Sequence, residues 1–207
     1  MAKRTMDRRS FLLCCSVALL NGCASSSTED VISIPVPAER FATEPYPVWP
    51  VDRSKFRRQF RPEKLSMVVH EQIGTIIVDT KAKQLFYVTG PNTVLRYGVA
   101  VGRSGYSWKG KAQVGRKAKW PAWYPTDDMH AQTPDLPKRI APGPVNPLGS
   151  RALYLFAGGR DTLYRIHGTD EPWTIGTEAS SGCIRMINED IIELFDKVEV
   201  GTAVIVI

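Results

Sequence analysis

The chain has 207 residues, of which 43% are hydrophobic and 23% are charged, with 27 basic and 21 acidic side chains. This composition is that of a globular domain with an appendage, and it excludes a collagen, a coiled coil and a wholly disordered chain. No basic stripe with interleaved aromatic residues occurs, so nucleic-acid binding is not expected.

The first 22 residues have the pattern of a secretory signal peptide. Lys3, Arg4, Arg8 and Arg9 form a basic region ahead of the apolar run 11–20, FLLCCSVALL. Ten residues are too few to span a bilayer, which favours a signal-peptide core over a membrane helix; a buried N-terminal helix is the alternative. Removal of residues 1–22 would leave 23 basic and 20 acidic groups, a net charge of +3.

Two further motifs indicate the route and fate of export. Residues 20–23, LNGC, resemble a bacterial lipobox, in which the cysteine, here Cys23, is lipidated and becomes the mature N-terminus. Residues 7–12, DRRSFL, resemble a twin-arginine motif. We therefore expect export to the periplasm and a lipid anchor on Cys23, in the inner or the outer membrane. Cys183 would then be the one free thiol of the processed chain, a candidate for reactivity or an inert buried cysteine.

Residues 23–68 are expected to be a lipid-anchored tether and a lead-in to the folded part of the chain. Serine and threonine begin the segment, and prolines recur through it, which favours an extended chain. The prolines are Pro35, Pro37, Pro45, Pro47 and Pro50. A basic run over residues 55–61 is either a solvated face or a contact to anionic glycan or lipid.

The rest of the chain, residues 69–207, is predicted to be one mainly β domain, a sandwich or barrel. Short runs rich in β-branched and aromatic residues predict strands, at residues 74–80, 83–88, 94–101, 152–156, 162–167 and 202–207. One helix is predicted at residues 188–198, with Asn188 as its cap and Glu189 and Asp190 at its positive end.

Residues 104–150 are predicted to be a long loop rich in aromatic residues and proline. Trp108, Trp120, Trp123 and Tyr124 lie among many glycines and prolines in this segment. Long loops of this kind are often binding loops, and flat aromatic rings suit sugars and peptide stems. The alternative is that these rings cover the edge of the core.

The segment 164–186 holds a pattern suited to nucleophilic catalysis. A thiol needs a neighbouring base to be substantially ionised at neutral pH, and His167 precedes Cys183 by sixteen residues. Backbone N–H groups at Gly182 and Cys183 are candidates for an oxyanion hole. Arg185 would share a strand face with Cys183 in an extended segment and could bind a carboxylate.

The order of these residues resembles the YkuD-type L,D-transpeptidase domain. The residues that carry the resemblance are His167-Gly168-Thr169 and Ser180-Ser181-Gly182-Cys183-Ile184-Arg185-Met186, with the upstream segments 143–149, GPVNPLG, and 120–123, WPAW. The resemblance covers roughly residues 70–207. Many members carry a second histidine directly before the Gly-Cys pair, where this chain has Ser181.

The resemblance implies a β-sandwich and acyl transfer without a metal or cofactor. It implies Cys183 as the nucleophile, His167 as the base and Arg185 as the motif arginine. We further expect Ser180, Ser181, Trp120 and Trp123 at the substrate site.

The implied substrate is a peptidoglycan tetrapeptide stem, which Cys183 would bind as a thioester with loss of the terminal D-Ala. The acceptor is left open: an amine of another stem gives a 3→3 cross-link, an envelope protein becomes anchored to the wall, and water gives hydrolysis. A peptidoglycan-binding lipoprotein without catalysis is the alternative, and a general cysteine peptidase is a third.

Overall fold

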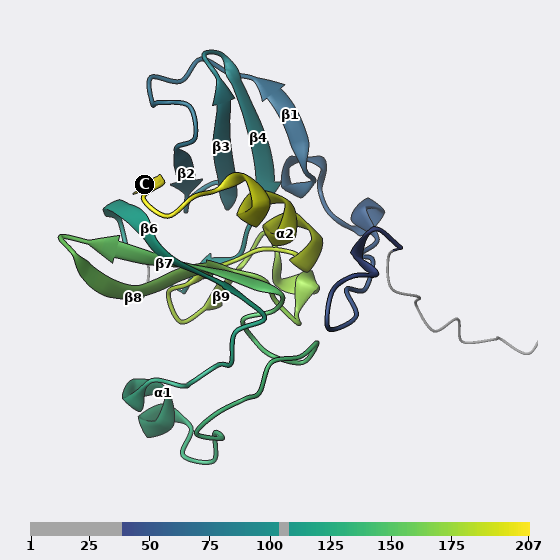
Figure 1. The fold of residues 1–207 in the computed structure, drawn as a ribbon, viewed down its shortest axis with the longest axis vertical. Coiled ribbons are helices and arrows are strands. Elements are labelled where there is room, and N and C mark those ends of the chain that lie inside the picture. Colours follow the sequence, from purple (N-terminus) through teal and green to yellow (C-terminus); the bar gives the residue numbers. More distant parts are fainter. Residues whose placement is uncertain (1–38, 104–107) are drawn as a thin grey trace, which may run out of the picture. The chain divides into compact units, whose positions relative to one another are not determined.

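The fold is built on a nine-stranded sheet that the computed structural model describes within residues 39–103 and 108–207 (Figure 1). The predicted signal peptide, the twin-arginine motif and Cys23 lie outside these described residues. The strand order in the sheet is β1-β4-β3-β2-β11-β6-β7-β8-β10. A second, two-stranded sheet pairs β5 with β9 in parallel.

The strands of the first half of the sheet are β1 (Glu63–Ser66), β2 (Ile76–Asp79), β3 (Gln84–Gly90) and β4 (Thr93–Gly98). The second half consists of β11 (Ala203–Val206), β6 (Gly110–Lys119), β7 (Arg151–Ala157), β8 (Arg160–His167) and β10 (Ile184–Arg185). The short sheet is β5 (Val101–Gly102) with β9 (Glu178–Ser180). The α-helices of the described residues are α1 (Asp127–Gln132) and α2 (Asn188–Lys197).

One hydrophobic core joins the two halves of the large sheet. Its buried side chains come from β2, β3 and β4 on one side, from β6, β7, β8 and β11 on the other, and from α2. Leu85, Leu155 and Leu194, one from each group, have no exposed surface. Figure 1 shows α2 between the two halves of the sheet. The apolar face of α2 therefore closes the opening of a bent, sandwich-like sheet.

The mainly β fold expected from the sequence is confirmed. The predicted strands at residues 74–80, 83–88, 152–156, 162–167 and 202–207 correspond to β2, β3, β7, β8 and β11, and the predicted helix corresponds to α2. The strand segments were recognisable because they are rich in β-branched and aromatic residues, which pack well on a pleated surface.

The predicted loop over residues 104–150 was wrong in part, because it contains the ten-residue strand β6 and the short helix α1. Only Val114 of β6 is buried, and four of the ten residues of the strand are lysine or arginine. Their long side chains cover aromatic rings: the Arg116 guanidinium lies 3.5 Å from the Tyr154 ring centroid, and Lys117 Nζ lies 4.4 Å from that of Phe195. β6 therefore lacks the apolar pattern by which a strand is recognised.

The prediction of a single strand over residues 94–101 was also wrong. β4 ends at Gly98, and the chain then leaves the large sheet to form β5. Between them, the Ala100 N–H donates to the Arg185 carbonyl at 3.0 Å and the Arg185 N–H donates to the Ala100 carbonyl at 2.8 Å. The break therefore brings Ala100 beside β10, at the edge where the motif residues lie.

The lead-in packs on the fold through residues 39–68. Short 3-10 helices occur at Glu39–Phe41, Arg53–Lys55 and Arg58–Phe60, and β1 pairs antiparallel with β4.

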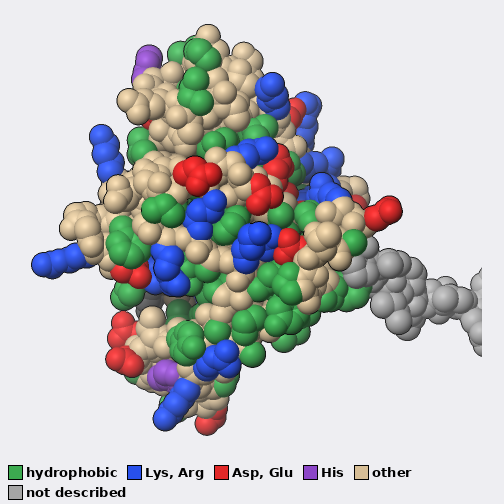
Figure 2. All heavy atoms as spheres, viewed as in Figure 1, with side chains coloured by type: hydrophobic (Ala, Val, Ile, Leu, Met, Phe, Trp, Pro, Cys, Tyr) green, Lys and Arg blue, Asp and Glu red, His purple; other side chains and the backbone are tan. Residues whose placement is uncertain are grey.

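Side chains of both charges are interspersed on the face of the molecule drawn in Figure 2. The division of the chain at residue 69 into tether and catalytic domain stays a prediction.

Candidate active site

His167 is the last residue of β8 and is buried, with 4% of its surface exposed. Its Nδ1 lies 2.5 Å from the carbonyl oxygen of Gly168. A carbonyl oxygen can only accept, so Nδ1 carries the hydrogen and Nε2 keeps its lone pair. Burial lowers the pKa of His167 to about 4, with Arg185 and Arg165 acting in the same direction and the Gly168 hydrogen bond opposing them. The imidazole is therefore neutral and able to accept a proton at neutral pH.

Cys183 follows a tight turn that Ser180 organises. The Ser180 hydroxyl donates to the Cys183 carbonyl at 2.5 Å and accepts from the Gly182 N–H at 3.1 Å. Gly182 has a φ of 124°, a conformation that side chains with a Cβ rarely adopt. Ser180 is buried, so its hydroxyl shapes the turn, whereas Ser181 is exposed.

The Cys183 side chain is partly exposed, and its sulfur lies 3.9 Å from the Leu163 carbonyl oxygen. Burial of the sulfur raises the pKa of the thiol, while the backbone N–H of Arg165 and the charges of Arg165 and Arg185 lower it. In the free protein the thiol therefore keeps its proton until a base takes it.

The pairing of β10 with β8 brings the motif residues together. The two strands are parallel, with Ile184 opposite Ile166 and Arg185 opposite His167. Ile166 and Ile184 both point into the core. Because side chains alternate along a strand, Arg185 and His167 lie on the opposite face, and Cys183 directly precedes β10.

Arg185 forms an ion pair that the sequence did not predict. Its Nη1 lies 2.6 Å from Oε2 of Glu171, which is 44% exposed. Glu171 stands four residues after His167, and nothing in its local sequence indicates a partner for Arg185. The guanidinium is therefore held by an anion that a substrate carboxylate could replace.

The predicted oxyanion donors differ in their environment. The Gly182 N–H is occupied by the Ser180 hydroxyl, so this group is not free to bind an oxyanion in the described geometry. The role of Gly182 as an oxyanion donor stays a prediction. The N–H of Cys183 itself stays the candidate donor.

Trp120 has a packing role in the structure. It is 5% exposed, its ring packs against Tyr46 with a centroid distance of 5.0 Å, and its Nε1–H donates to Glu44 at 2.6 Å. This position matches the alternative in which loop rings cover the core. Trp123 is half-buried, and its backbone pairs with Ile140.

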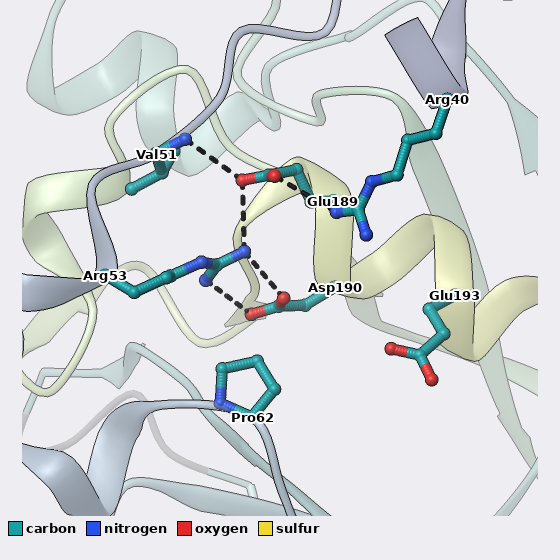
Figure 3. Close-up of a pocket in the computed structure, with 7 residues that line it drawn as sticks. All are labelled: Arg40, Val51, Arg53, Pro62, Glu189, Asp190 and Glu193. Carbon is teal, nitrogen blue, oxygen red and sulfur yellow. Dashed lines mark hydrogen bonds and ion pairs between the residues drawn. The ribbon is translucent and has the colours of Figure 1, made fainter. Parts of the chain in front are cut away.

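A cavity of about 450 Å³, which Cys183 does not line, lies between the lead-in and α2 (Figure 3). Arg53 binds both oxygens of Asp190, at 2.9 and 2.8 Å, and one oxygen of Glu189 at 3.1 Å. Glu189 also accepts from Arg40 and from the Val51 N–H. We call this set, Arg40, Val51, Arg53, Glu189 and Asp190, the lead-in clamp. Glu189 and Asp190 stand in the first turn of α2, at its positive end as predicted, and they also pair with the lead-in.

A second contact ties the lead-in to β7. Arg151 is 2% exposed, and its guanidinium forms an ion pair with Glu44 of the lead-in. The same carboxylate accepts from Trp120, and the pKa of Glu44 is lowered, chiefly by its hydrogen bond to Arg151. Residues 39–53 thus pair with three buried charged side chains, Arg151 of β7 and Glu189 and Asp190 of α2.

The described residues contain no group of three or more metal-binding side chains. Within the same ranges, no helix has the length and apolar character needed to cross a bilayer.

Comparison with known proteins gives one consistent family. Residues 73–206 match the family described as YkuD, L,D-transpeptidase catalytic domain. The probable L,D-transpeptidase YbiS of Escherichia coli K12 is 40% identical over 153 residues, which cover 69% of this chain and 47% of the relative. The chain thus spans about half the length of such curated relatives.

Two solved structures share the fold. A protein from Brucella melitensis, named as a probable carnitine operon oxidoreductase caia, is 46% identical, with 72% of this chain and 94% of that chain covered and a TM-score of 0.50. An L,D-transpeptidase from Mycobacterium smegmatis is 16% identical, with 64% and 58% covered and a TM-score of 0.50.

Proposed function

Because the chain belongs to the L,D-transpeptidase catalytic domain family, we propose that it is a peptidoglycan transpeptidase whose nucleophile is Cys183. The observation that supports the proposal is the β8–β10 pairing, in which Arg185 lies opposite His167 and Cys183 directly precedes β10. His167 Nε2 has a lone pair available for the thiol proton, because Nδ1 is bound to the Gly168 carbonyl.

The proposed reaction has two halves. In the first, His167 takes the proton of Cys183, and the thiolate attacks the carbonyl of the third residue of a tetrapeptide stem. The bond to the terminal D-Ala breaks, its amine takes the proton from His167, and a thioester remains on Cys183. The Cys183 N–H is the proposed donor to the tetrahedral oxyanion.

In the second half an amine attacks the thioester. His167 takes the amine proton and returns it to the departing thiolate, so that a new amide forms and the free enzyme is restored. A stem amine gives a 3→3 cross-link, an amine of an envelope protein gives a wall-anchored protein, and water gives a shortened stem.

Arg185 is proposed to bind a carboxylate of the stem in exchange for Glu171. The guanidinium is 18% exposed and lies two residues from the thiol. A bidentate contact from arginine to a carboxylate would orient the stem for attack.

The test is incubation of the purified protein with tetrapeptide muropeptides and mass spectrometry of the products. Loss of D-Ala with formation of a cross-linked dimer supports the transpeptidase, and loss of D-Ala alone indicates hydrolysis. Binding of the muropeptides with no product, in a folded protein, would favour a non-catalytic peptidoglycan-binding lipoprotein. The name of the Brucella protein denotes redox chemistry, and no contact of the described residues favours that reaction over acyl transfer.

The periplasm and a lipid anchor on Cys23 are proposed as the site of action. The support is the basic region, the short apolar run and the LNGC sequence at residues 20–23. Cys23→Ala should release the protein from the membrane fraction and leave its reaction with muropeptides unchanged. Membrane association that persists in Cys23→Ala would contradict lipidation at this residue.

A further inference from the structure

The side chain of Asn188 lies between residue Ser150, which precedes β7, and residue Thr169, which follows β8. Asn188 is the first residue of α2, and the N-cap position is held by Ile187, so the side chain does not cap the helix as predicted. Its Oδ1 accepts from the Ser150 N–H at 2.9 Å, and its Nδ2 donates to the Thr169 carbonyl at 2.9 Å. One amide thus bridges the start of β7 and the segment that follows β8.

Two glycines make room for this amide. A Cβ built on Gly149 or on Gly168 would collide with Asn188 Oδ1. Gly149 also has a φ of 60°, which favours glycine independently. The Asn188 amide therefore fills a slot that exists only because both neighbours lack side chains.

The bridged segment includes the carbonyl that orients His167. The Gly168 carbonyl accepts the His167 Nδ1–H, and the peptide group before it is fixed by the Gly168 N–H, which donates to the Arg151 carbonyl at 3.0 Å. The peptide group after it is fixed by Asn188 through the Thr169 carbonyl. The acceptor of the imidazole hydrogen is thus held from both sides.

We infer that Asn188 is a positioning residue: its bond to the Thr169 carbonyl fixes the peptide group that follows the Gly168 carbonyl, and so keeps His167 in the tautomer with an unprotonated Nε2. The inference rests on the proposed function, because it takes His167 to be the base that removes the Cys183 proton. It adds a residue that touches neither substrate nor thiol and acts through the backbone of the motif. A ring nitrogen's proton is set by the hydrogen bond that the other nitrogen makes.

The test measures the reaction of Cys183 with iodoacetamide over a range of pH, which reports thiolate formation without any peptidoglycan substrate. In the full-length protein, His167→Ala is the reference for a site without its base. Asn188→Ala should lower the rate at neutral pH by about ten- to a hundredfold, as small misplacements of catalytic groups do. Its pH profile should move toward that of His167→Ala.

Three further variants separate an effect on positioning from a loss of stability. Val94→Ala shortens a fully buried side chain in the cluster of Ile77 and Val88, which lies apart from the main core, and lowers the melting temperature with no change in the pH profile. The double variant Asn188→Ala with Gly168→Ala puts a methyl group where the amide was. It should recover melting temperature relative to Gly168→Ala alone, but it should not recover the pH profile.

The outcomes are distinct for the inference and for the proposed function. A wild-type profile in Asn188→Ala, with a changed profile in His167→Ala, overturns the inference alone. Recovery of the profile in the double variant also overturns it, because the amide would then only fill space. Identical profiles in wild type and His167→Ala would instead count against the Cys183–His167 pair of the proposed function.

Discussion

Two buried polar regions lie at the two ends of the segment 183–190. One contains neutral ionisable side chains, and the other contains charged side chains in ion pairs. At one end, burial of His167 and Cys183 disfavours their charged forms, so both are neutral in the free protein. At the other end, the buried carboxylates of Glu189 and Asp190 are bound by Arg53. The first region keeps groups that must change their protonation state, and the second keeps charges that are already paired.

From this difference we expect some substitutions to change the rate of Cys183 acylation and others to change the free energy of unfolding. A buried pair of charges holds two segments together, and removal of one partner leaves the other unpaired. A neutral, poorly solvated thiol and imidazole contribute little to holding the fold but are available for proton transfer. The predictions below test this separation.

The largest effect is expected for Cys183→Ala, which should abolish acylation. The probe is a carbapenem, whose strained lactam carbonyl offers the same electrophile as the stem, with intact-protein mass spectrometry as the readout. Wild type should gain the mass of one drug molecule and Cys183→Ala none, while their unfolding free energies differ by less than about 1 kcal/mol, because the side chain is partly exposed. An adduct on the variant would place the nucleophile elsewhere.

His167→Gln should lower the acylation rate by about 10²–10⁴-fold, the usual contribution of general-base catalysis. Glutamine can still donate to the Gly168 carbonyl but cannot accept a proton. Stopped-flow measurement of carbapenem acylation gives the rate, and circular dichroism verifies the fold. A loss below about tenfold, in a folded variant, would assign the base to another group.

Glu44→Ala should act on stability. It leaves Arg151, which is 2% exposed, without its ion-pair partner, at a cost of about 3–5 kcal/mol in the free energy of unfolding. The matched control is Arg40→Ala, whose 64% exposed side chain pairs with Glu189 and should contribute at most about 1 kcal/mol. Urea denaturation measures both. Equal losses in the two variants would show that burial of Arg151 does not decide the cost.

The pH dependence of stability sharpens the contrast. Burial lowers the pKa of His167 from 6.5 to about 4, so between these values the unfolded chain binds a proton that the folded protein does not. Stability should therefore fall as pH drops from 6.5 to 4, by about 3 kcal/mol from this residue. His167→Gln should remove that part of the fall.

Asp190 acts in the opposite direction over an overlapping range. Burial raises its pKa from 3.8 to about 6, against the effect of Arg53, so in this range the folded protein binds the extra proton and stability falls as pH rises. The quantity to compare is thus the difference between wild type and His167→Gln at each pH. A constant difference from pH 4 to pH 7 would contradict the assigned shift of His167.

The motif residues were predictable because their order along the chain is itself the signal. His167, Cys183 and Arg185 fall within nineteen residues, and β7 is apolar enough to be recognised. The nine-strand order was not predictable, because β6 has a polar sequence and becomes a strand through its neighbours β11 and β7.

The partners of the site were hidden from the sequence for a different reason. Glu44 contacts Arg151 across 107 positions, and Arg53 contacts Asp190 across 137. No local pattern connects residues so far apart. Asn188 was predicted as a cap because capping is what an asparagine at a helix start usually does, and tertiary contacts to Ser150 and Thr169 replaced that role.

The lead-in clamp and the Glu44–Arg151 ion pair also have a mechanical consequence. A pull on the chain ahead of residue 39 would first load the contacts of Arg40, Glu44 and Arg53, because these residues precede β1 along the chain. The contacts reach α2 and β7 rather than the β8–β10 edge, so tension would be borne beside the site and not across it. With the proposed lipid anchor at Cys23, such tension would leave His167 and Cys183 in register.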